Sequence, residues 1–291
     1  MAQGEPMQEE GFNVHLDLVR DWSSDLKDMI RALGVDPLES ADLTSLAVQY
    51  RMLVQRIVQP GRREVKYATQ FECPKDKEAA LADFVVASNE GSSLRKYQSR
   101  LTRDGTYKDA MLISWGIQHF HLHQVVESDG FVERTDPLLF AIVNSDAVYC
   151  IGFWGHGDWS EQEIIGIVHD NWPELIAAHR IQGMTLAGDV PTNEHLRLMR
   201  KNRVNAAFSP RPGVLYFPPG GGQTADGGSF TALREAMALQ RYARGFEPFA
   251  IDAYKKANSP LTKDVSLRGR LAGDRAWVED ESGRVVATVG S

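Results

Sequence analysis

Three histidines alternate along one short stretch of the chain and are the strongest candidates for chemistry. His119, His121 and His123 are separated by single residues, and His156 follows two apolar runs. Histidine can accept and donate a proton near neutral pH, because its ordinary pKa is about 6.5. Arg134 lies between these histidines in the sequence and could supply a positive charge. The residue types therefore favour acid–base catalysis on an anionic substrate.

The stretch that carries the three histidines is predicted to be a strand. Phe120 and Leu122 occupy the alternate positions, and neighbouring side chains of a strand point to opposite faces. The histidines should therefore share one face, while the two apolar residues enter the core. Two further apolar runs, 138–143 and 147–153, are joined by a short polar turn and predict a hairpin after this strand.

This set of residues would suit a metal-independent ribonuclease. Such an enzyme needs a base for the 2′-hydroxyl proton, an acid for the leaving 5′-oxygen and a cation for the charge of the phosphorane. We expect His119 or His121 to be the base and His156 to be the acid, with Arg134 on the phosphate. The chemistry requires no cofactor.

A basic stretch before the histidines and two tryptophans near His156 would bind RNA. The expected phosphate contacts are Arg95, Lys96, Arg100 and Arg103. Trp154 and Trp159 could stack on a base. The formal net charge is −7, but the first 50 residues hold ten acidic and only three basic side chains. The rest of the chain is therefore balanced, and an RNA partner is compatible with its charge.

The same histidines also allow a metal site. Two histidines separated by one strand residue lie about 6.6 Å apart, which is workable for two zinc ligands. His119 with His121, or His121 with His123, could be completed by His156 or Asp158. That site would make the protein a metal-dependent hydrolase. A third alternative is a non-catalytic protein that binds nucleic acid or another protein.

Four segments around the histidines resemble a family of poorly characterised bacterial proteins. They are Asp109–Leu122, which contains WGIQHFHL, Arg134–Ala141, His156–Trp159 and Asn171–Glu174. Over residues 107–180, the order of a basic residue, apolar strands and an acidic helix is also distantly similar to the RelE-like ribonuclease toxins. The second resemblance implies a ribonuclease with a bacterial toxin or phage-defence role.

Composition narrows the class of protein further. The 291 residues are 43% hydrophobic and 24% charged, which is typical of a globular protein. No apolar run approaches the roughly 20 residues that span a bilayer, and the chain does not start like a signal peptide. We therefore expect a cytoplasmic protein with no membrane partner. Cys73 and Cys150 are too few for a disulfide framework.

The elements that must position the histidines predict an α+β fold. Apolar residues at helical spacing indicate helices over 19–33 and 43–57, so residues 1–90 are expected to form a mainly helical N-terminal region. Residues 91–291 are expected to form an α+β domain that bears the histidines, with a mostly antiparallel sheet and packed helices.

The second of these helices carries an apolar stripe. Its members are Leu43, Leu46, Tyr50, Leu53 and Ile57. Packing inside the molecule is the simpler interpretation of such a stripe. The alternatives are pairing with a second copy of the chain, which would give a homo-oligomer, or docking of a neutralising protein partner.

Overall fold

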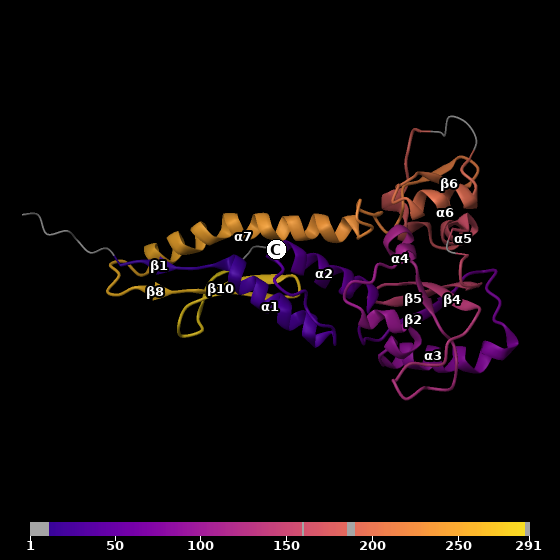
Figure 1. The fold of residues 1–291 in the computed structure, drawn as a ribbon, viewed down its shortest axis with the longest axis horizontal. Coiled ribbons are helices and arrows are strands. Elements are labelled where there is room, and N and C mark those ends of the chain that lie inside the picture. Colours follow the sequence, from indigo (N-terminus) through magenta and orange to yellow (C-terminus); the bar gives the residue numbers. More distant parts are fainter. Residues whose placement is uncertain (1–11, 159, 185–189, 289–291) are drawn as a thin grey trace, which may run out of the picture. The chain divides into compact units, whose positions relative to one another are not determined.

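The computed structural model describes residues 12–158, 160–184 and 190–288 (Figure 1). The α+β fold predicted from the sequence is confirmed. The chain divides into two compact units, the first made of Met1–Tyr50 with Glu235–Ser291 and the second of Arg51–Arg234. This division differs from the boundary expected at residue 90, because the first strand and helix after residue 50 belong with the histidines. The C-terminal strands instead join the N-terminal helix.

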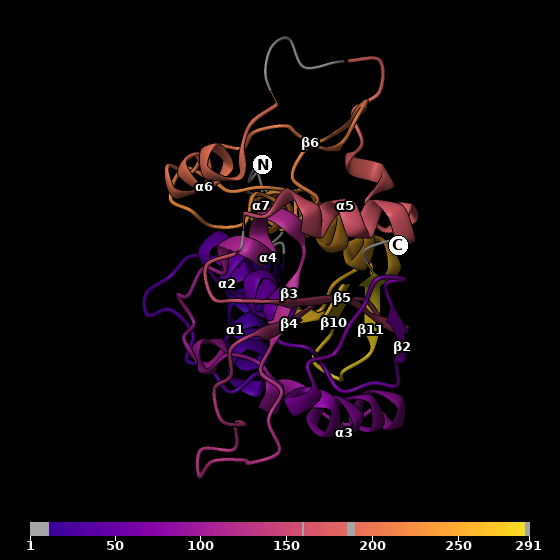
Figure 2. The same cartoon turned by 90° about the vertical axis from the view of Figure 1, so that its right-hand side faces the viewer.

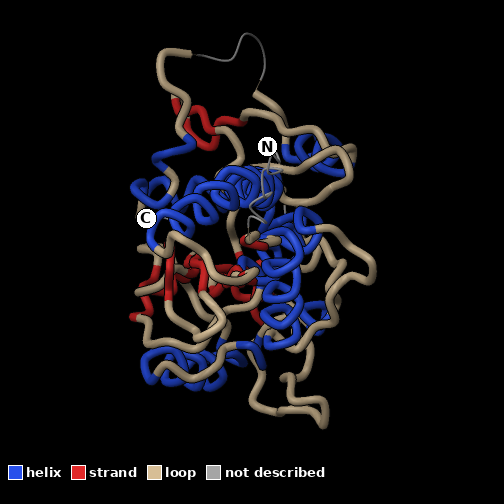
Figure 3. Tube along the Cα trace, turned by 90° about the vertical axis from the view of Figure 1, so that its left-hand side faces the viewer, coloured by secondary structure: helices blue, strands red, loops and turns tan. Residues whose placement is uncertain are grey.

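The first unit combines the two ends of the chain. It contains α1 (Leu18–Ala32), β1 (Val14–His15), β8 (Val265–Ser266), β9 (Arg268–Ala272), β10 (Arg275–Glu279), β11 (Val285–Thr288), the start of α2 (Leu43–Arg56) and most of α7 (Phe230–Ala257). Helix α1 lies beside β9 of the antiparallel sheet β11-β10-β9. Figure 3 shows the helices of the chain in blue and its strands in red. Buried carboxylates of Asp21 and Asp25 accept hydrogen bonds from the backbone N–H groups of Gly269 (2.9 Å) and Leu271 (2.7 Å). These bonds satisfy strand amides that would otherwise be buried without a partner.

The second unit contains the elements that carry the candidate site. Its helices and strands are β2 (Glu64–Tyr67), α3 (Glu78–Glu90), α4 (Ala110–Trp115), β3 (Gln118–Phe120), β4 (Leu138–Val143), β5 (Ala147–Trp154), α5 (Gln162–Asn171), α6 (Asn193–Lys201), β6 (Phe208–Arg211) and β7 (Val214–Tyr216). Short 3₁₀ helices cover Lys75–Lys77, Arg95–Tyr97, Arg100–Arg103, Pro173–Leu175 and Ala177–His179.

The main sheet of this unit has the strand order β2-β5-β4-β3. Strands β3, β4 and β5 are antiparallel, as the hairpin prediction requires, and only β2 pairs in parallel with β5. Helices α3 and α5 lie on opposite sides of the sheet (Figure 2). Phe140 packs in the core on the α5 side, whereas Phe120 and Leu122 pack on the α3 side. The sheet is therefore buried on both faces, which leaves its ends as the places for polar groups.

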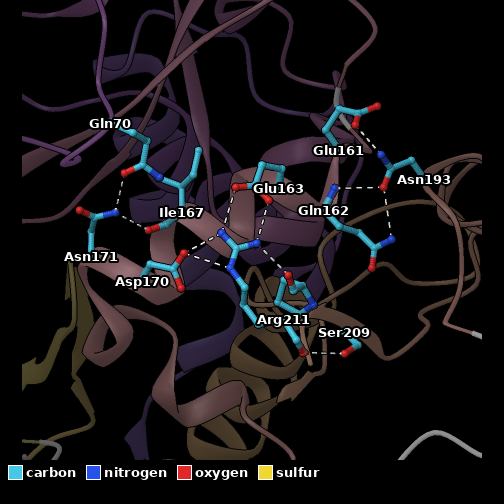
Figure 4. A network of polar contacts seen from close by, with 11 residues as sticks. Gln70, Glu161, Gln162, Glu163, Ile167, Asp170, Asn171, Asn193, Ser209 and Arg211 are labelled. Atoms are coloured by element: carbon cyan, nitrogen blue, oxygen red, sulfur yellow. Dashed lines mark hydrogen bonds and ion pairs between the residues drawn. The ribbon is translucent and has the colours of Figure 1, made fainter. Parts of the chain in front are cut away.

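A polar network joins β6 to α5 (Figure 4). The Arg211 guanidinium is bonded to the Glu163 carboxylate (2.7 and 2.9 Å) and to Asp170 Oδ2 (2.6 Å). It lies directly over Gly166, where an added Cβ would be 2.1 Å from Arg211 Nη1. The glycine therefore makes room for the cation that pairs with both carboxylates of α5.

Within the three described ranges, none of the helices combines the length and the apolar character that crossing a bilayer requires.

Candidate active site

The candidate site lies at one end of the main sheet in the second unit. His119 is on β3, His121 follows the end of β3, Asp136 lies two residues before β4, and His156 lies two residues after β5. Antiparallel pairing sets Leu139 opposite Phe120 and Leu138 opposite Trp154. Because the start of β4 faces the ends of its two neighbours, residues from three separate segments meet there.

His156 is held by Asp136. One carboxylate oxygen, Asp136 Oδ1, lies 3.0 Å from the His156 backbone nitrogen and 3.2 Å from His156 Nδ1. Both contacts from His156 lower the pKa of Asp136. An ionised carboxylate can only accept hydrogen bonds, so the proton of a neutral His156 ring is on Nδ1. Its Nε2 is then the atom that can accept a proton.

The turn around His156 is fixed by a second carboxylate. Asp158 Oδ2 accepts a hydrogen bond from the Gly155 backbone N–H at 3.0 Å. A Cβ added at Gly155 would lie 3.3 Å from Asp158 Oδ2 and 3.7 Å from Asp136 Oδ1. The small residue therefore lets both carboxylates approach the turn.

His121 is the buried partner of His156, with 5.8 Å between the two ring centroids. Its Nδ1 accepts a hydrogen bond of 3.0 Å from the Thr135 backbone N–H. Burial, with further contributions from His119, His156 and Arg134, lowers the pKa of His121 to about 4. The neutral ring therefore carries its proton on Nε2 and is a hydrogen-bond donor there. Since its only accepting atom is engaged by Thr135, His121 does not suit the role of base that the sequence suggested.

His119 is the third histidine of this cluster. Its side chain is 9% exposed, and its Nδ1 lies 3.8 Å from Asp109 Oδ2. Burial lowers the pKa of His119, a nearby positive charge on His156 would lower it further, and Asp109 opposes this effect. Asp109 is placed there because it caps α4, where its Oδ1 accepts from the N–H groups of Met111 (3.1 Å) and Leu112 (3.0 Å).

His123 is separated from the cluster by the end of the strand. Strand β3 ends at Phe120, so strict alternation does not continue to His123. The half-exposed His123 ring places its Nδ1 3.7 Å from Glu133 Oε2. His119 and His121 interact electrostatically with His156.

Arg134 is exposed and precedes the residues that hold the two histidines. Its charge contributes to the low pKa of His121. In the part of the chain that the structure describes, the Arg134 guanidinium has no hydrogen bond or ion pair. It is therefore available for an anion that approaches the histidines.

The four cations expected to contact phosphate differ from Arg134, because they are in contact with other groups of the protein. Arg100 is paired with Asp129 at 2.6 Å and with Glu127, and Arg103 bonds to the carbonyl oxygen of Asp129. Both guanidinium groups also lie over the Phe131 ring.

The other two cations of this stretch are also in contact with the protein. Lys96 Nζ lies 4.8 Å from the centre of the Tyr97 ring. Burial lowers the pKa of Arg95. Contacts within the protein thus engage the basic side chains that the sequence suggested for RNA binding.

Of the two tryptophans expected to stack on a base, the structure describes Trp154. Trp154 is half-buried and packs on Phe140, with 5.3 Å between ring centroids. It also lines a cavity of about 450 Å³ beside the site. Trp159 lies outside the described residues.

The described residues contain no group of three or more His, Cys, Asp or Glu side chains arranged to hold a metal ion. The hydrogen bonds of the two closest histidines leave one ring nitrogen lone pair between them. His121 Nδ1 accepts from the Thr135 N–H, so the neutral ring carries its proton on Nε2. His156 Nδ1 faces Asp136 and leaves its Nε2 lone pair, while Asp158 Oδ2 accepts from the Gly155 N–H.

Sequence reasoning missed the residues that orient the histidines. Thr135 and Asp136 follow Arg134 directly, but neither residue type is unusual before a strand. The signal that could have identified them is the hairpin itself, because the residue before one strand lies beside the residue after its antiparallel neighbour.

Comparison with known proteins gives no identification: no protein family, no curated protein and no solved structure matches the chain.

Proposed function

We propose that the protein is a metal-independent ribonuclease whose reaction is carried out by the cluster of His119, His121, His156, Asp136 and Arg134. The observation that carries the proposal is the pair His121 and His156, with ring centroids 5.8 Å apart and opposite roles at their Nε2 atoms. One ring offers a proton acceptor that a carboxylate orients, and the other offers a neutral donor. An exposed arginine is close enough to lower the pKa of the donor.

Each group then has a defined role. His156 Nε2 accepts the proton of the 2′-hydroxyl as its oxygen attacks phosphorus, and Asp136 stabilises the imidazolium that forms. His121 Nε2–H and Arg134 donate to the non-bridging oxygens, where negative charge develops. The bond to the 5′-oxygen breaks, the leaving oxygen takes a proton from water, and His156 later returns its proton to solvent. The products are a 2′,3′-cyclic phosphate and a free 5′-hydroxyl.

This assignment changes the roles expected from the sequence. His156 replaces His119 or His121 as the base, because the Thr135 amide occupies His121 Nδ1. His119 supports the site through its position next to Asp109 and through its interactions with the other two histidines.

The experiment is cleavage of a labelled single-stranded oligoribonucleotide of mixed sequence. His156→Ala should lower turnover by about 10²- to 10⁴-fold, the usual contribution of a positioned proton acceptor. His123→Ala is the matched control, because His123 is in the same segment but pairs with Glu133, and it should retain activity. An oligonucleotide with 2′-deoxyribose at the scissile position should resist cleavage.

Three results would overturn the proposal. They are full activity of His156→Ala, equal cleavage of the 2′-deoxy substrate, and loss of activity in EDTA that zinc or manganese restores. The last result would favour the metal-dependent hydrolase, and binding of RNA without cleavage would favour the non-catalytic alternative.

The biological role that we propose is a cytoplasmic toxin or phage-defence effector. Its support is the distant similarity of residues 107–180 to the RelE-like ribonuclease toxins, in the order of a basic residue, apolar strands and an acidic helix. Expression of the wild-type chain in bacteria should then arrest growth, whereas expression of His156→Ala should not. Equal growth with both chains would contradict this role and would leave the cleavage assay as the test of the chemistry.

A further inference from the structure

A cavity of about 450 Å³ opens beside the histidine cluster. Its lining residues include two aromatic residues, two prolines and two polar residues, namely Phe153, Trp154, Pro74, Pro137, Gln70 and Glu72. Flat apolar walls with a few polar groups at one side are the features of a site for a planar heterocycle. The volume is ample for one nucleobase.

The chain places this cavity next to the proposed reaction. Pro137 follows Asp136 directly, and Trp154 lies two residues before His156. Gln70 and Glu72 follow β2, and β2 runs parallel to β5, so both strands end at the same edge of the sheet. A nucleotide whose phosphate reached His156 would therefore have its base close to this cavity.

One polar wall of the cavity is fixed by α5 (Figure 4). Asn171, the last residue of α5, donates from Nδ2 to Gln70 Oε1 at 3.2 Å and accepts at Oδ1 from the Thr69 backbone N–H at 2.8 Å. The Asn171 amide is itself held by the Ile167 carbonyl at 2.9 Å. Because Gln70 Oε1 is engaged, the group that Gln70 offers to a ligand is its Nε2 donor.

We infer that this cavity binds guanine. The inference rests on the proposed function, because it takes the ligand to be a base of RNA. The Glu72 carboxylate only accepts hydrogen bonds, and the free Gln70 group donates them. Guanine presents two neighbouring donors, N1–H and the N2 amino group, next to the O6 acceptor. Adenine instead presents a lone pair at N1, which a carboxylate repels. The charges and donors of the cavity therefore match guanine, while its aromatic walls provide the stacking surface used in recognition of single-stranded RNA.

The test is calorimetric binding of guanosine 3′-monophosphate and adenosine 3′-monophosphate to the full chain. We expect the guanosine nucleotide to bind at least about tenfold more tightly, the usual size of discrimination by a paired hydrogen bond to a base. Glu72→Gln should reduce this preference to within about threefold, because it replaces one acceptor with a donor and removes the charge. Glu90→Gln, a change of an exposed glutamate at the end of α3, should leave the preference unchanged.

Binding and cleavage can fail independently in this design. Equal affinity for the two nucleotides in the wild-type chain, or a preference that survives Glu72→Gln, would overturn the guanine assignment even if RNA is cleaved. If the chain shows a Glu72-dependent preference for the guanosine nucleotide but cleaves no RNA, the guanine assignment stands and the ribonuclease proposal is wrong. Where RNA is cleaved, mapping of the cut sites should show the same Glu72-dependent preference for guanosine.

Discussion

Two polar clusters of the second unit follow opposite electrostatic rules. One is the histidine cluster at the end of the main sheet, and the other is formed by Arg211 of β6 and the carboxylates of α5. Glu163 and Asp170 surround Arg211 with opposite charge, and hydrogen bonds to both carboxylates raise the pKa of Arg211. The histidine cluster instead brings basic groups together, and burial lowers the pKa of His121 to about 4. The first arrangement, in which opposite charges are paired, stabilises the fold. The second disfavours protonation and is typical of sites that handle protons.

The comparison indicates where a polar cluster serves the fold and where it serves chemistry. Around Arg211, the structure uses the donor atoms in bonds to α5 and to the Pro210 carbonyl. Around His121 and His156, one nitrogen of each ring is anchored, which orients the other nitrogen. Ring nitrogens that are oriented in this way without being used by the fold are typical of functional sites.

Among the residues that anchor these two clusters, Asp136 should show the largest effect. Asp136→Asn should lower turnover on the order of 10²-fold, because the amide no longer stabilises the imidazolium and permits the wrong ring tautomer. The loss should be smaller than for a fully buried aspartate, since 65% of the Asp136 side chain is exposed. KM should change little. Steady-state cleavage kinetics would measure this, and an effect confined to KM would contradict the role of Asp136 in orienting the base.

A change in the Arg211 cluster should act on stability alone. Gly166→Ala places a Cβ 2.1 Å from Arg211 Nη1, so the guanidinium must leave its carboxylates. We expect a loss of about 2 kcal/mol in the free energy of unfolding, measured in urea, with turnover per folded molecule unchanged. In the Arg211→Met background the same change should be neutral or stabilising, because alanine is the better helix former. An equal loss in both backgrounds would show that Gly166 does not serve Arg211.

The low pKa of His121 predicts a dependence of stability on pH. Between about pH 6.5 and 4, the unfolded chain binds a proton at this histidine whereas the folded chain does not, so stability falls as the pH falls. His121→Asn removes this titration but keeps an oxygen that can accept from Thr135. The difference in unfolding free energy between the two chains should therefore change by on the order of 2 kcal/mol from pH 7 to pH 4. Parallel curves over that range would mean that His121 is not buried in its neutral form.

The sequence predicted much of the fold because the relevant signals are local. Helical spacing predicted a helix over 19–33, and α1 spans Leu18–Ala32. The two apolar runs predicted the β4–β5 hairpin. The division into units could not be predicted in this way, because it depends on the pairing of Asp21 and Asp25 with strand amides about 250 residues away in the sequence, a relation that no periodicity records.

The candidate site shows the same limit. Residue types identified His119, His121 and His156, but only the structure shows which nitrogen of each ring is engaged. His123 fits the same alternating pattern and lies elsewhere, because β3 ends at Phe120. The basic stretch also illustrates this limit, since the sequence shows the charge of Arg100 but not its partners Asp129 and Glu127.

The smallest expected effect concerns two arginines that the sequence does not distinguish. Arg134 has no ion pair among the described residues, whereas Arg100 is paired with two carboxylates. Arg134→Ala should reduce turnover by about tenfold. It should also change the slope of log affinity against log salt by about 0.7, the value for one contact to a single-stranded phosphate.

Arg100→Ala should change this slope by less, because the carboxylate partners of Arg100 already balance its charge in the free protein. RNA affinity measured from low to high salt for both variants tests this order. A larger change of slope for Arg100→Ala would show that RNA displaces Asp129 and Glu127, and the basic stretch would then be part of the binding surface after all.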